Sequence, residues 1–211
     1  MQARVRWHVR ENDILINHEM VRRMKIVLAS ESQSRRRAMD MVGVPYETRP
    51  ANIDEKAIRD NDPAQLTRKL AEAKAWKVAG DCPDAVIVSG DAVAAKDGKI
   101  YEKPRDLDEA AQLLRELAGS EFQFVTSVAV LHARKRRLLS AVEVSNITFR
   151  PLVEREIQDY ITKYAVLNYA GAFESDAVLK FAERISGAVH VGTALPVSRL
   201  IVMLREQGVE V

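Results

Sequence analysis

The chain has 211 residues, of which 47% are apolar and 29% are charged, so it can bury one substantial core but is too short for two large independent domains. No apolar run approaches the roughly 20 residues that a membrane span needs, and the first residues lack the apolar core of a signal peptide. Cys82 is the only cysteine, which excludes an internal disulfide and a thiolate metal cluster and fits a cytoplasmic protein.

The net charge of +2 arises in residues 1–23, where five arginines outnumber three acidic residues. The rest of the chain is neutral overall, which argues against a protein whose task is to cover a nucleic-acid backbone. We interpret residues 1–23 as an N-terminal extension ahead of a single domain at 24–211, with Met24 as the candidate start. The alternative is an ordered N-terminal arm.

Local signals place the elements of the first half of the domain. Gly43 closes a helix, because glycine readily adopts the left-handed conformation that ends helices. Asp62 and Pro63 supply an N-cap and a first-turn proline, and they open a long helix that stops at Gly80. The predicted elements are a buried strand at 25–29, a loop that becomes a helix at 30–42, a strand at 46–53 and a helix from 63 to about 79.

The second half alternates in the same way. The apolar run Ala85–Val88 suits a central strand covered on both faces, Asp97-Gly98 is a hairpin turn, and Asp106 caps a helix that ends at Gly119. The basic run 134–137 is typical of a solvated hairpin tip. Further predicted elements are strands at 93–95, 99–101, 123–132 and 138–149, and helices at about 153–164 and 196–207. This order predicts an α/β fold with a mixed sheet flanked by helices.

Three serines and three arginines follow the first strand. Ser30, Ser32 and Ser34 alternate along the loop, and Arg35 begins the run of arginines. Backbone N–H groups at a helix start, hydroxyl donors and a guanidinium together suit a phosphate. The alternative is that the serines only cap the helix while the arginines line its exposed face.

Two lysines are candidates for the same phosphate. Lys74 shares a helix face with Leu70 and Val78, so its amine either extends to water or reaches a buried anion. Lys103 follows the hairpin at 93–101 and lies near the same crevice if that hairpin folds over it. Otherwise Lys103 is an ordinary loop lysine.

Acidic residues follow two of the predicted strands. Asp91, in Ser89-Gly90-Asp91, comes after the most hydrophobic strand, where open α/β sheets have their ligand crevice, and it is a candidate metal ligand or general base. Asp54-Glu55 closes the strand predicted at 46–53 and can supply a second carboxylate. Two carboxylates plus phosphate oxygens suit Mg²⁺. The alternative for each acid is a turn residue at the end of a strand.

These features occur in the order that is found in the Maf family, which the chain resembles from Lys25 to about Gln207. The family opens with a strand, Leu-Ala-Ser-x-Ser and an arginine-bearing helix, and Asp-Glu, Lys-Ala, Gly-Asp and Lys-Pro pairs follow. The matching residues are Leu28–Ser32 with Arg35, Asp54-Glu55, Lys74-Ala75, Gly90-Asp91, Lys103-Pro104, Thr126, Phe149–Leu152 with Glu156-Ile157, and Ala170–Phe173.

The resemblance implies an elongated α/β fold of two lobes around a central cleft, similar to inosine triphosphatase, and a homodimer. It also implies an enzyme that uses Mg²⁺ or Mn²⁺ to hydrolyse a nucleoside triphosphate to the monophosphate and pyrophosphate. By the same resemblance, Asp91 activates water and holds the metal with Glu55. The residues that would bind the triphosphate are Ser30, Ser32, Arg35, Lys74 and Lys103.

The resemblance also points to three positions that select the base. Asp176, at the end of Phe173–Asp176, is similar to the branch acting on 7-methyl-GTP, since an acid suits the N–H donors of a purine edge. Ser34 and Ala92 match neither that branch nor the branch acting on thymidine and uridine nucleotides. We expect a preference for 7-methyl-GTP among modified nucleotides. A pyrimidine or deaminated purine is the alternative.

A third hypothesis comes from a different class of protein. The chain could be a nucleotide-binding regulator of septum formation without turnover. Asp91, Glu55 and the two lysines disfavour this hypothesis, because a protein that only binds a nucleotide needs no positioned base.

Overall fold

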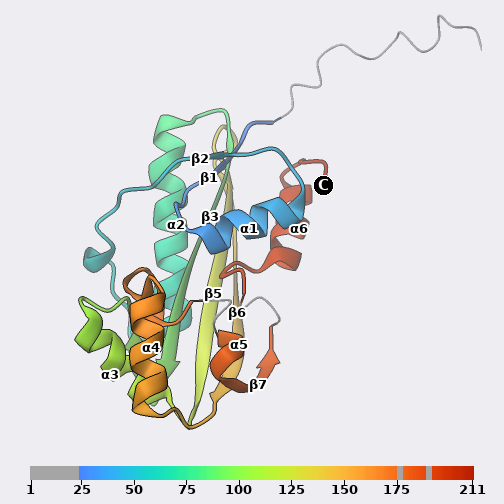
Figure 1. Cartoon of the computed structure of the whole chain (residues 1–211). Helices are drawn as coiled ribbons and strands as arrows, with labels where there is room; N and C mark the ends of the chain where they lie inside the picture. The colour runs from blue at the N-terminus through green and yellow to red at the C-terminus, as the bar shows by residue number, and fades with distance from the viewer. Residues whose placement is uncertain (1–23, 175–177, 189–191) are drawn as a thin grey trace, which may run out of the picture.

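A computed structural model describes residues 24–174, 178–188 and 192–211. Its strands form one mixed sheet in the order β2-β1-β3-β5-β6-β7, with β4 paired to β3, along an elongated molecule (Figure 1). The α/β fold with a mixed sheet is therefore confirmed, whereas the N-terminal extension lies outside the described residues. The strands are β1 (Ile26–Leu28), β2 (Glu47–Thr48), β3 (Val86–Lys96), β4 (Lys99–Tyr101), β5 (Glu121–His132), β6 (Arg137–Phe149) and β7 (Ala182–Gly187).

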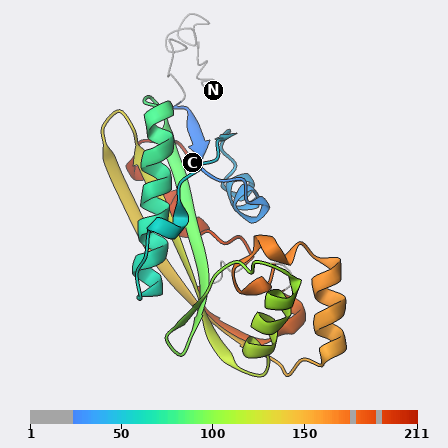
Figure 2. The same ribbon diagram turned by 90° about the vertical axis from the view of Figure 1, so that its left-hand side faces the viewer.

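Helices cover both faces of the sheet at one end of the molecule. Because alternate side chains of a strand point to opposite faces, Val27 and Ile87 pack with α2, while Leu28 and Val88 pack with α1 and α6. At the other end, α3 and α4 pack around a second core that is rich in phenylalanine (Figure 2). The helices are α1 (Gln33–Val42), α2 (Pro63–Asp81), α3 (Leu107–Leu117), α4 (Glu154–Lys163), α5 (Val178–Phe181) and α6 (Val197–Glu206), with the 3₁₀ helices η2 (Glu55–Ala57), η3 (Val166–Asn168) and η4 (Ala170–Ala172).

The helix ends follow the predicted caps, with one exception. The side chains of Asp62 and Asp106 accept hydrogen bonds from first-turn N–H groups of α2 and α3, and Gly43 ends α1 with φ of 79°. The predicted stop of α2 at Gly80 is wrong, because the helix continues to Asp81. One glycine inside a helix costs only about 1 kcal/mol, which the packing of a 19-residue helix can offset.

The strand predicted at 46–53 is mostly wrong. Only Glu47–Thr48 pairs, because β1 beside it is three residues long. Pro50 has no N–H with which to extend the ladder, and Asn52 adopts φ of 45°, outside the strand region. Glu55 consequently opens the short helix η2 instead of closing a strand.

The strand β3 is longer than predicted. It runs without a break from Val86 to Lys96, so the prediction that Asp91 lies at a strand end is wrong. One edge of β3 pairs with β1 at 86–88 and with β4 at 94–96, while β5 pairs along its other edge throughout 86–95. Between β1 and β4, residues 89–93 have no strand neighbour on that edge within the described ranges. Asp91 is at the centre of this interval.

Besides the 3₁₀ helices η3 and η4, two described elements near the C-terminus have no counterpart in the predictions. The helix α5 is only four residues long, and β7 is an edge strand whose side chains are exposed or half-buried, so neither produces an apolar periodicity. No helix among the described residues is long and apolar enough to cross a membrane.

The basic run 134–137 lies at the turn between β5 and β6, as predicted. Arg134 contacts Asp84 at 2.6 Å, Arg137 contacts Glu206 at 3.4 Å, and Arg136 lies 5.0 Å from the centre of the Trp76 ring. These arginines are therefore paired within the chain.

Candidate active site

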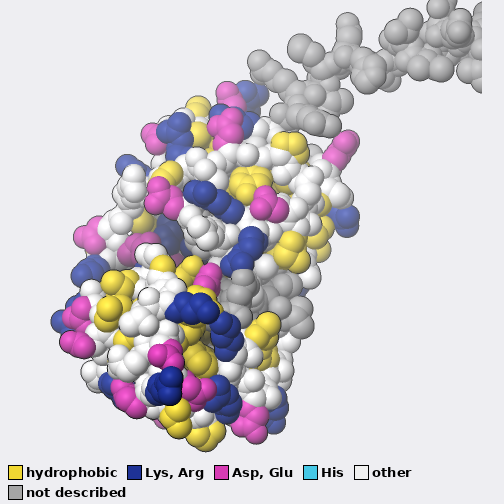
Figure 3. All heavy atoms as spheres, viewed as in Figure 1, with side chains coloured by type: hydrophobic (Ala, Val, Ile, Leu, Met, Phe, Trp, Pro, Cys, Tyr) yellow, Lys and Arg dark blue, Asp and Glu magenta, His cyan; other side chains and the backbone are white. Residues whose placement is uncertain are grey.

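A cleft of about 560 Å³ opens where the two ends of the molecule meet. Lys and Arg side chains gather across the middle of this face (Figure 3). The volume suits a small-molecule ligand, since such pockets measure roughly 300–1,000 Å³. The lining comes from the segment after β1, the segment before and into η2, the helix α2, the segment after β4, and the loop around η3: Ala29–Gln33, Arg35, Pro50–Ile53, Glu55, Lys74, Lys103, Ala165, Asn168 and Tyr169.

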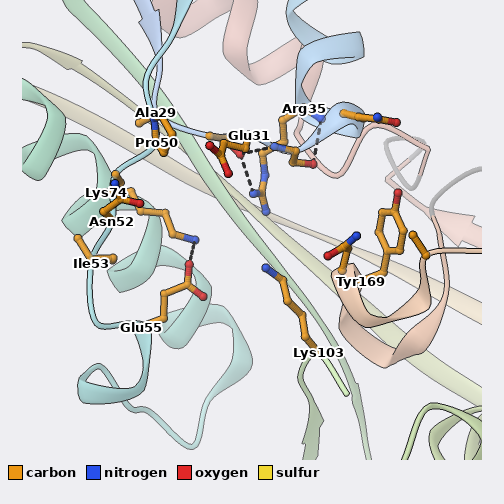
Figure 4. Close-up of a pocket in the computed structure, with 16 residues that line it drawn as sticks. Ala29, Glu31, Arg35, Pro50, Asn52, Ile53, Glu55, Lys74, Lys103 and Tyr169 are labelled. Atoms are coloured by element: carbon orange, nitrogen blue, oxygen red, sulfur yellow. Dashed lines mark hydrogen bonds and ion pairs between the residues drawn. The ribbon is translucent and has the colours of Figure 1, made fainter. Parts of the chain in front are cut away.

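Lys74 joins two carboxylates at one side of this cleft. Its Nζ lies 2.8 Å from Oε1 of Glu55, which lines the cleft with it (Figure 4). The same Nζ lies 2.7 Å from Oδ1 of Asp91, a residue of β3 that is not among the residues lining the cleft. Only 7% of Lys74 is exposed, and Asp91 is equally buried. The amine of Lys74 therefore reaches a buried anion and does not extend to water.

The position of α2 against β3 and β5 is set by two buried hydroxyls. Ser89 Oγ donates to the carbonyl of Ala71 at 2.6 Å, and Ser127 Oγ donates to the carbonyl of Thr67 at 2.7 Å. Both bonds tie a strand to the backbone of α2 on the N-terminal side of Lys74, at Ala71 about one turn away and at Thr67 about two turns away. They therefore fix the register in which Lys74 meets the carboxylate from β3.

Arg35 is turned into the cleft from the first turns of α1. Ser32 caps this helix by accepting a hydrogen bond from the Arg35 backbone N–H at 3.4 Å, and Ser30 Oγ accepts one from the guanidinium at 3.3 Å. The capping and the phosphate hypotheses for this segment are thus compatible. Burial lowers the pKa of Arg35, while the negative charges of Asp91 and Glu55 oppose that shift.

The Nε atom of Arg35 is buried and has no hydrogen-bond partner among the described residues. A buried donor without an acceptor costs free energy, so this atom is suited to an acceptor that a ligand brings. Gly90 lies beside it, where a Cβ atom would stand 3.6 Å from that Nε, 2.6 Å from the Ser127 carbonyl oxygen and 2.8 Å from Leu195. Only glycine leaves this space open.

Glu55 is held as an anion by three cations. Burial would raise its pKa, but the charges of Lys74, Lys103 and Arg35 and the hydrogen bond from Lys74 outweigh burial, and the pKa lies below its ordinary value. Glu55 therefore presents a carboxylate to the cleft at neutral pH.

Glu55 and Asp91 are too few to hold a divalent cation by themselves, so they fit one only if a bound phosphate ligand supplies further oxygen atoms. Two carboxylates reach one point in space, since both contact the same nitrogen of Lys74. Among the described residues there is no group of three or more His, Cys, Asp or Glu side chains that could hold a metal ion. Mg²⁺ accepts such a site when phosphate oxygens and water complete its coordination.

Of the three predicted specificity residues, the two that the structure describes, Ser34 and Ala92, are not among the residues lining the cleft. Ser34 is 1% exposed and accepts a hydrogen bond from Arg37 at 3.5 Å, away from the cleft lining. Ala92 is half-buried against the phenylalanine-rich core. Asp176 lies outside the described residues.

Several residues that line the cleft were not predicted from the sequence as site residues. They include Glu31, Asn52, Asn168 and Tyr169. For Asn168 and Tyr169 a signal was present, because both directly precede the Ala-Gly-Ala-Phe stretch on which the resemblance partly rests. Their side chains carry no charge, which is why a search for phosphate ligands passed over them.

Comparison with known proteins gives the following relatives. The family model described as Maf-like protein matches residues 25–207. A dTTP/UTP pyrophosphatase of Salinibacter ruber is 36% identical, covering 85% of this chain and 89% of its own length. A 7-methyl-GTP pyrophosphatase of Pseudomonas aeruginosa is 33% identical, covering 88% and 98%. Among solved structures, a HAM1 protein from Coxiella burnetii matches 87% of this chain and 99% of its own, with 13% identity and a TM-score of 0.46.

Proposed function

Because the chain belongs to the Maf-like protein family, we propose that the cleft beside β3 is the active site of a nucleoside triphosphate pyrophosphatase. The curated relatives, among them a nucleoside triphosphate pyrophosphatase of Synechococcus, carry names of this activity. The observation that carries the proposal is the ion-pair cluster of Glu55, Lys74 and Asp91. Glu55 and Lys74 of this cluster line a cleft together with Arg35 and Lys103.

The reaction in this proposal is attack of water on the α-phosphorus. Asp91 accepts a proton from the water, an oxygen–phosphorus bond forms, and the bond from the α-phosphorus to the bridging oxygen of the β-phosphate breaks. The products are a nucleoside monophosphate and pyrophosphate. Phosphoryl transfer depends mainly on positioning and on cations near the equatorial and leaving oxygens. Arg35, Lys74 and Lys103 supply these cations, with the hydroxyls of Ser30 and Ser32 as additional donors.

Glu55 and Asp91 would hold a divalent cation, Mg²⁺ or Mn²⁺, together with phosphate oxygens. When bound, the metal neutralises the charge that develops on those oxygens. The Lys74 ammonium compensates the two carboxylates in the structure described, and a triphosphate gives this ammonium an alternative anion.

For the base, 7-methyl-GTP is the substrate that we propose to test first. The proposal rests on the Phe173–Asp176 stretch and on the 7-methyl-GTP pyrophosphatase among the relatives. A preference for dTTP and UTP is the second candidate, and the Salinibacter ruber relative favours it. Both candidates share the phosphate chemistry and differ only in the contacts to the base.

The test is a screen of nucleoside triphosphates for pyrophosphate release, with Mg²⁺ and with Mn²⁺. The panel includes dTTP, UTP, GTP, 7-methyl-GTP and ITP. We expect release from at least one of them, and a fall of about 1,000-fold or more in Asp91→Asn, which cannot accept the proton but keeps the shape of the side chain. Nucleotide binding, measured by calorimetry, should persist in that variant.

Two outcomes of the screen would overturn the proposal. One is that the wild-type protein binds nucleotides but releases no pyrophosphate from any of them, which would favour the regulator hypothesis. The other is full activity of Asp91→Asn, which would remove Asp91 from the mechanism.

A further inference from the structure

Tyr169 is an aromatic ring at the edge of a cleft that is otherwise polar and aliphatic. Within the described part of the chain, it is the only aromatic side chain in the cleft lining. It lies across the cleft from Glu55 and Lys74, on the far side of Lys103, whose side chain points into the opening between them (Figure 4). A ligand whose phosphates meet the cations therefore has this ring at its other end.

The loop that carries Tyr169 is anchored on both sides. The hydroxyl of Tyr169 donates to Oε1 of Glu174 at 3.2 Å, and the N–H of Glu174 donates to the hydroxyl of Tyr160 at 2.8 Å. Two residues after Tyr169, the N–H of Gly171 donates to the carbonyl of Glu102 at 3.1 Å. Since Glu102 directly precedes Lys103, this bond ties the ring to the segment that supplies a phosphate-binding cation.

The turn at Gly171 is closely packed against its neighbours. Gly171 has φ of 69°, and a Cβ atom there would lie 2.7 Å from the ring of Phe173 and 3.2 Å from Ala94. Glycine is therefore required at this turn. The half-buried ring of Tyr169 is thus held in place before any ligand binds, which lowers the entropy cost of using it as a contact surface.

We propose that Tyr169 is the platform on which the base of the bound nucleotide stacks. The inference rests on the proposed function, and it assigns selection of the base to a residue outside the three positions predicted from sequence. Every base presents a π-face, so the ring adds affinity for all nucleotides. It favours a purine over a pyrimidine, because the purine covers more of the ring. It favours a 7-methylated guanine most, because the positive charge of that base is attracted to the face of the tyrosine.

The test compares nucleotides with inorganic tripolyphosphate, which has the three phosphates but no base. In Tyr169→Ala, we expect the Kd for GTP and 7-methyl-GTP, measured by calorimetry with Ca²⁺ in place of the reactive metal, to rise about tenfold or more. The Kd for tripolyphosphate should change less than about twofold. Tyr169→Phe, which keeps the ring but loses the contact to Glu174, should stay within about threefold of the wild type for every ligand. For substrates that turn over, the change should appear in KM and not in kcat.

Tyr46→Ala is the matched control, because Tyr46 is a half-buried tyrosine outside the cleft lining and its removal should alter neither Kd. Equal loss of tripolyphosphate and nucleotide binding in Tyr169→Ala would show that the ring only supports the cleft, and unchanged nucleotide binding would show that no base stacks there. Either result overturns the inference. Because binding is measured without turnover, the result is independent of whether the chain releases pyrophosphate.

Discussion

Lys74 is the residue that connects the two carboxylates of the candidate site. It is a buried cation with two anionic partners, and removal of its ammonium leaves the buried Asp91 without this ion-pair partner. Breaking a buried ion pair on one side is costly. The local pattern around Lys74 left two alternatives open, because a lysine on an apolar helix face looks the same whether it ends in water or against a carboxylate.

We predict that Lys74→Met lowers the free energy of unfolding by about 3 kcal/mol at pH 7. Urea denaturation measures this change. Lys77→Met is the matched control, because Lys77 is exposed on the same helix, and we expect its effect to stay within about 0.5 kcal/mol. Equal effects of the two substitutions would contradict the view that Lys74 compensates the buried carboxylate.

The same variant probes the cation site. In Lys74→Met, the two carboxylates lose the ammonium that lies between them, so Mn²⁺ should bind more tightly in the absence of nucleotide. Electron paramagnetic resonance of Mn²⁺ measures the fraction bound without any need for turnover. Unchanged or weaker Mn²⁺ binding would indicate that Glu55 and Asp91 do not form a cation site.

At the scale of elements, the end of β6 is joined to α4 by one charged pair. Arg150, directly after β6, donates to both carboxylate oxygens of Glu156 at 2.6 and 3.1 Å, and Glu156 also accepts from the Val153 N–H at 3.1 Å. The hydrogen bonds from Arg150, followed by the one from Val153, lower the pKa of Glu156 to about 2. This pair closes the first turn of α4 and positions the helix against the core.

The lowered pKa of Glu156 predicts how stability depends on pH. A carboxyl group whose pKa is lower in the folded state contributes stability above its unfolded pKa of roughly 4.3, and loses that contribution as the pH falls toward its folded pKa. Glu156→Gln should therefore lower the Tm at pH 7, by a difference that shrinks between about pH 4.3 and pH 2. Differential scanning calorimetry across this range is the measurement, with the exposed Glu183→Gln as control. A difference that does not vary with pH would refute this role of the pair.

Helices were predicted more accurately than strands, for a physical reason. Asp62, Asp106 and Gly43 act on neighbouring N–H and C=O groups, so their effect is visible in a short window of sequence. Strand lengths depend on partners far along the chain. The strand β3 continues to Lys96 because β5 pairs along it to Ala95 and β4 pairs with its last three residues. The strand predicted at 46–53 shrinks to two residues because its partner β1 ends at Leu28.

At the scale of the whole molecule, the cleft lies near the interval of β3 that neither β1 nor β4 pairs, because Lys74 of the lining contacts Asp91 in that interval. Arg35, Glu55, Lys74 and Lys103 come from four different segments, and they share one cleft although up to 68 residues separate them in sequence. No local pattern could predict this meeting. The resemblance to a family predicted it, through the order of short motifs. Tyr169 was missed although it directly precedes one of those motifs, because its side chain is uncharged and the prediction considered only phosphate ligands.

Hydrolysis in ¹⁸O-labelled water determines whether water attacks the α-phosphorus of the nucleotide, as we propose for this cleft. A substrate found in the nucleotide screen is hydrolysed to completion, and mass spectrometry locates the label. Attack at the α-phosphorus predicts one ¹⁸O atom in the nucleoside monophosphate and none in the pyrophosphate. Label in the pyrophosphate, or release of inorganic phosphate with a nucleoside diphosphate, would contradict the account.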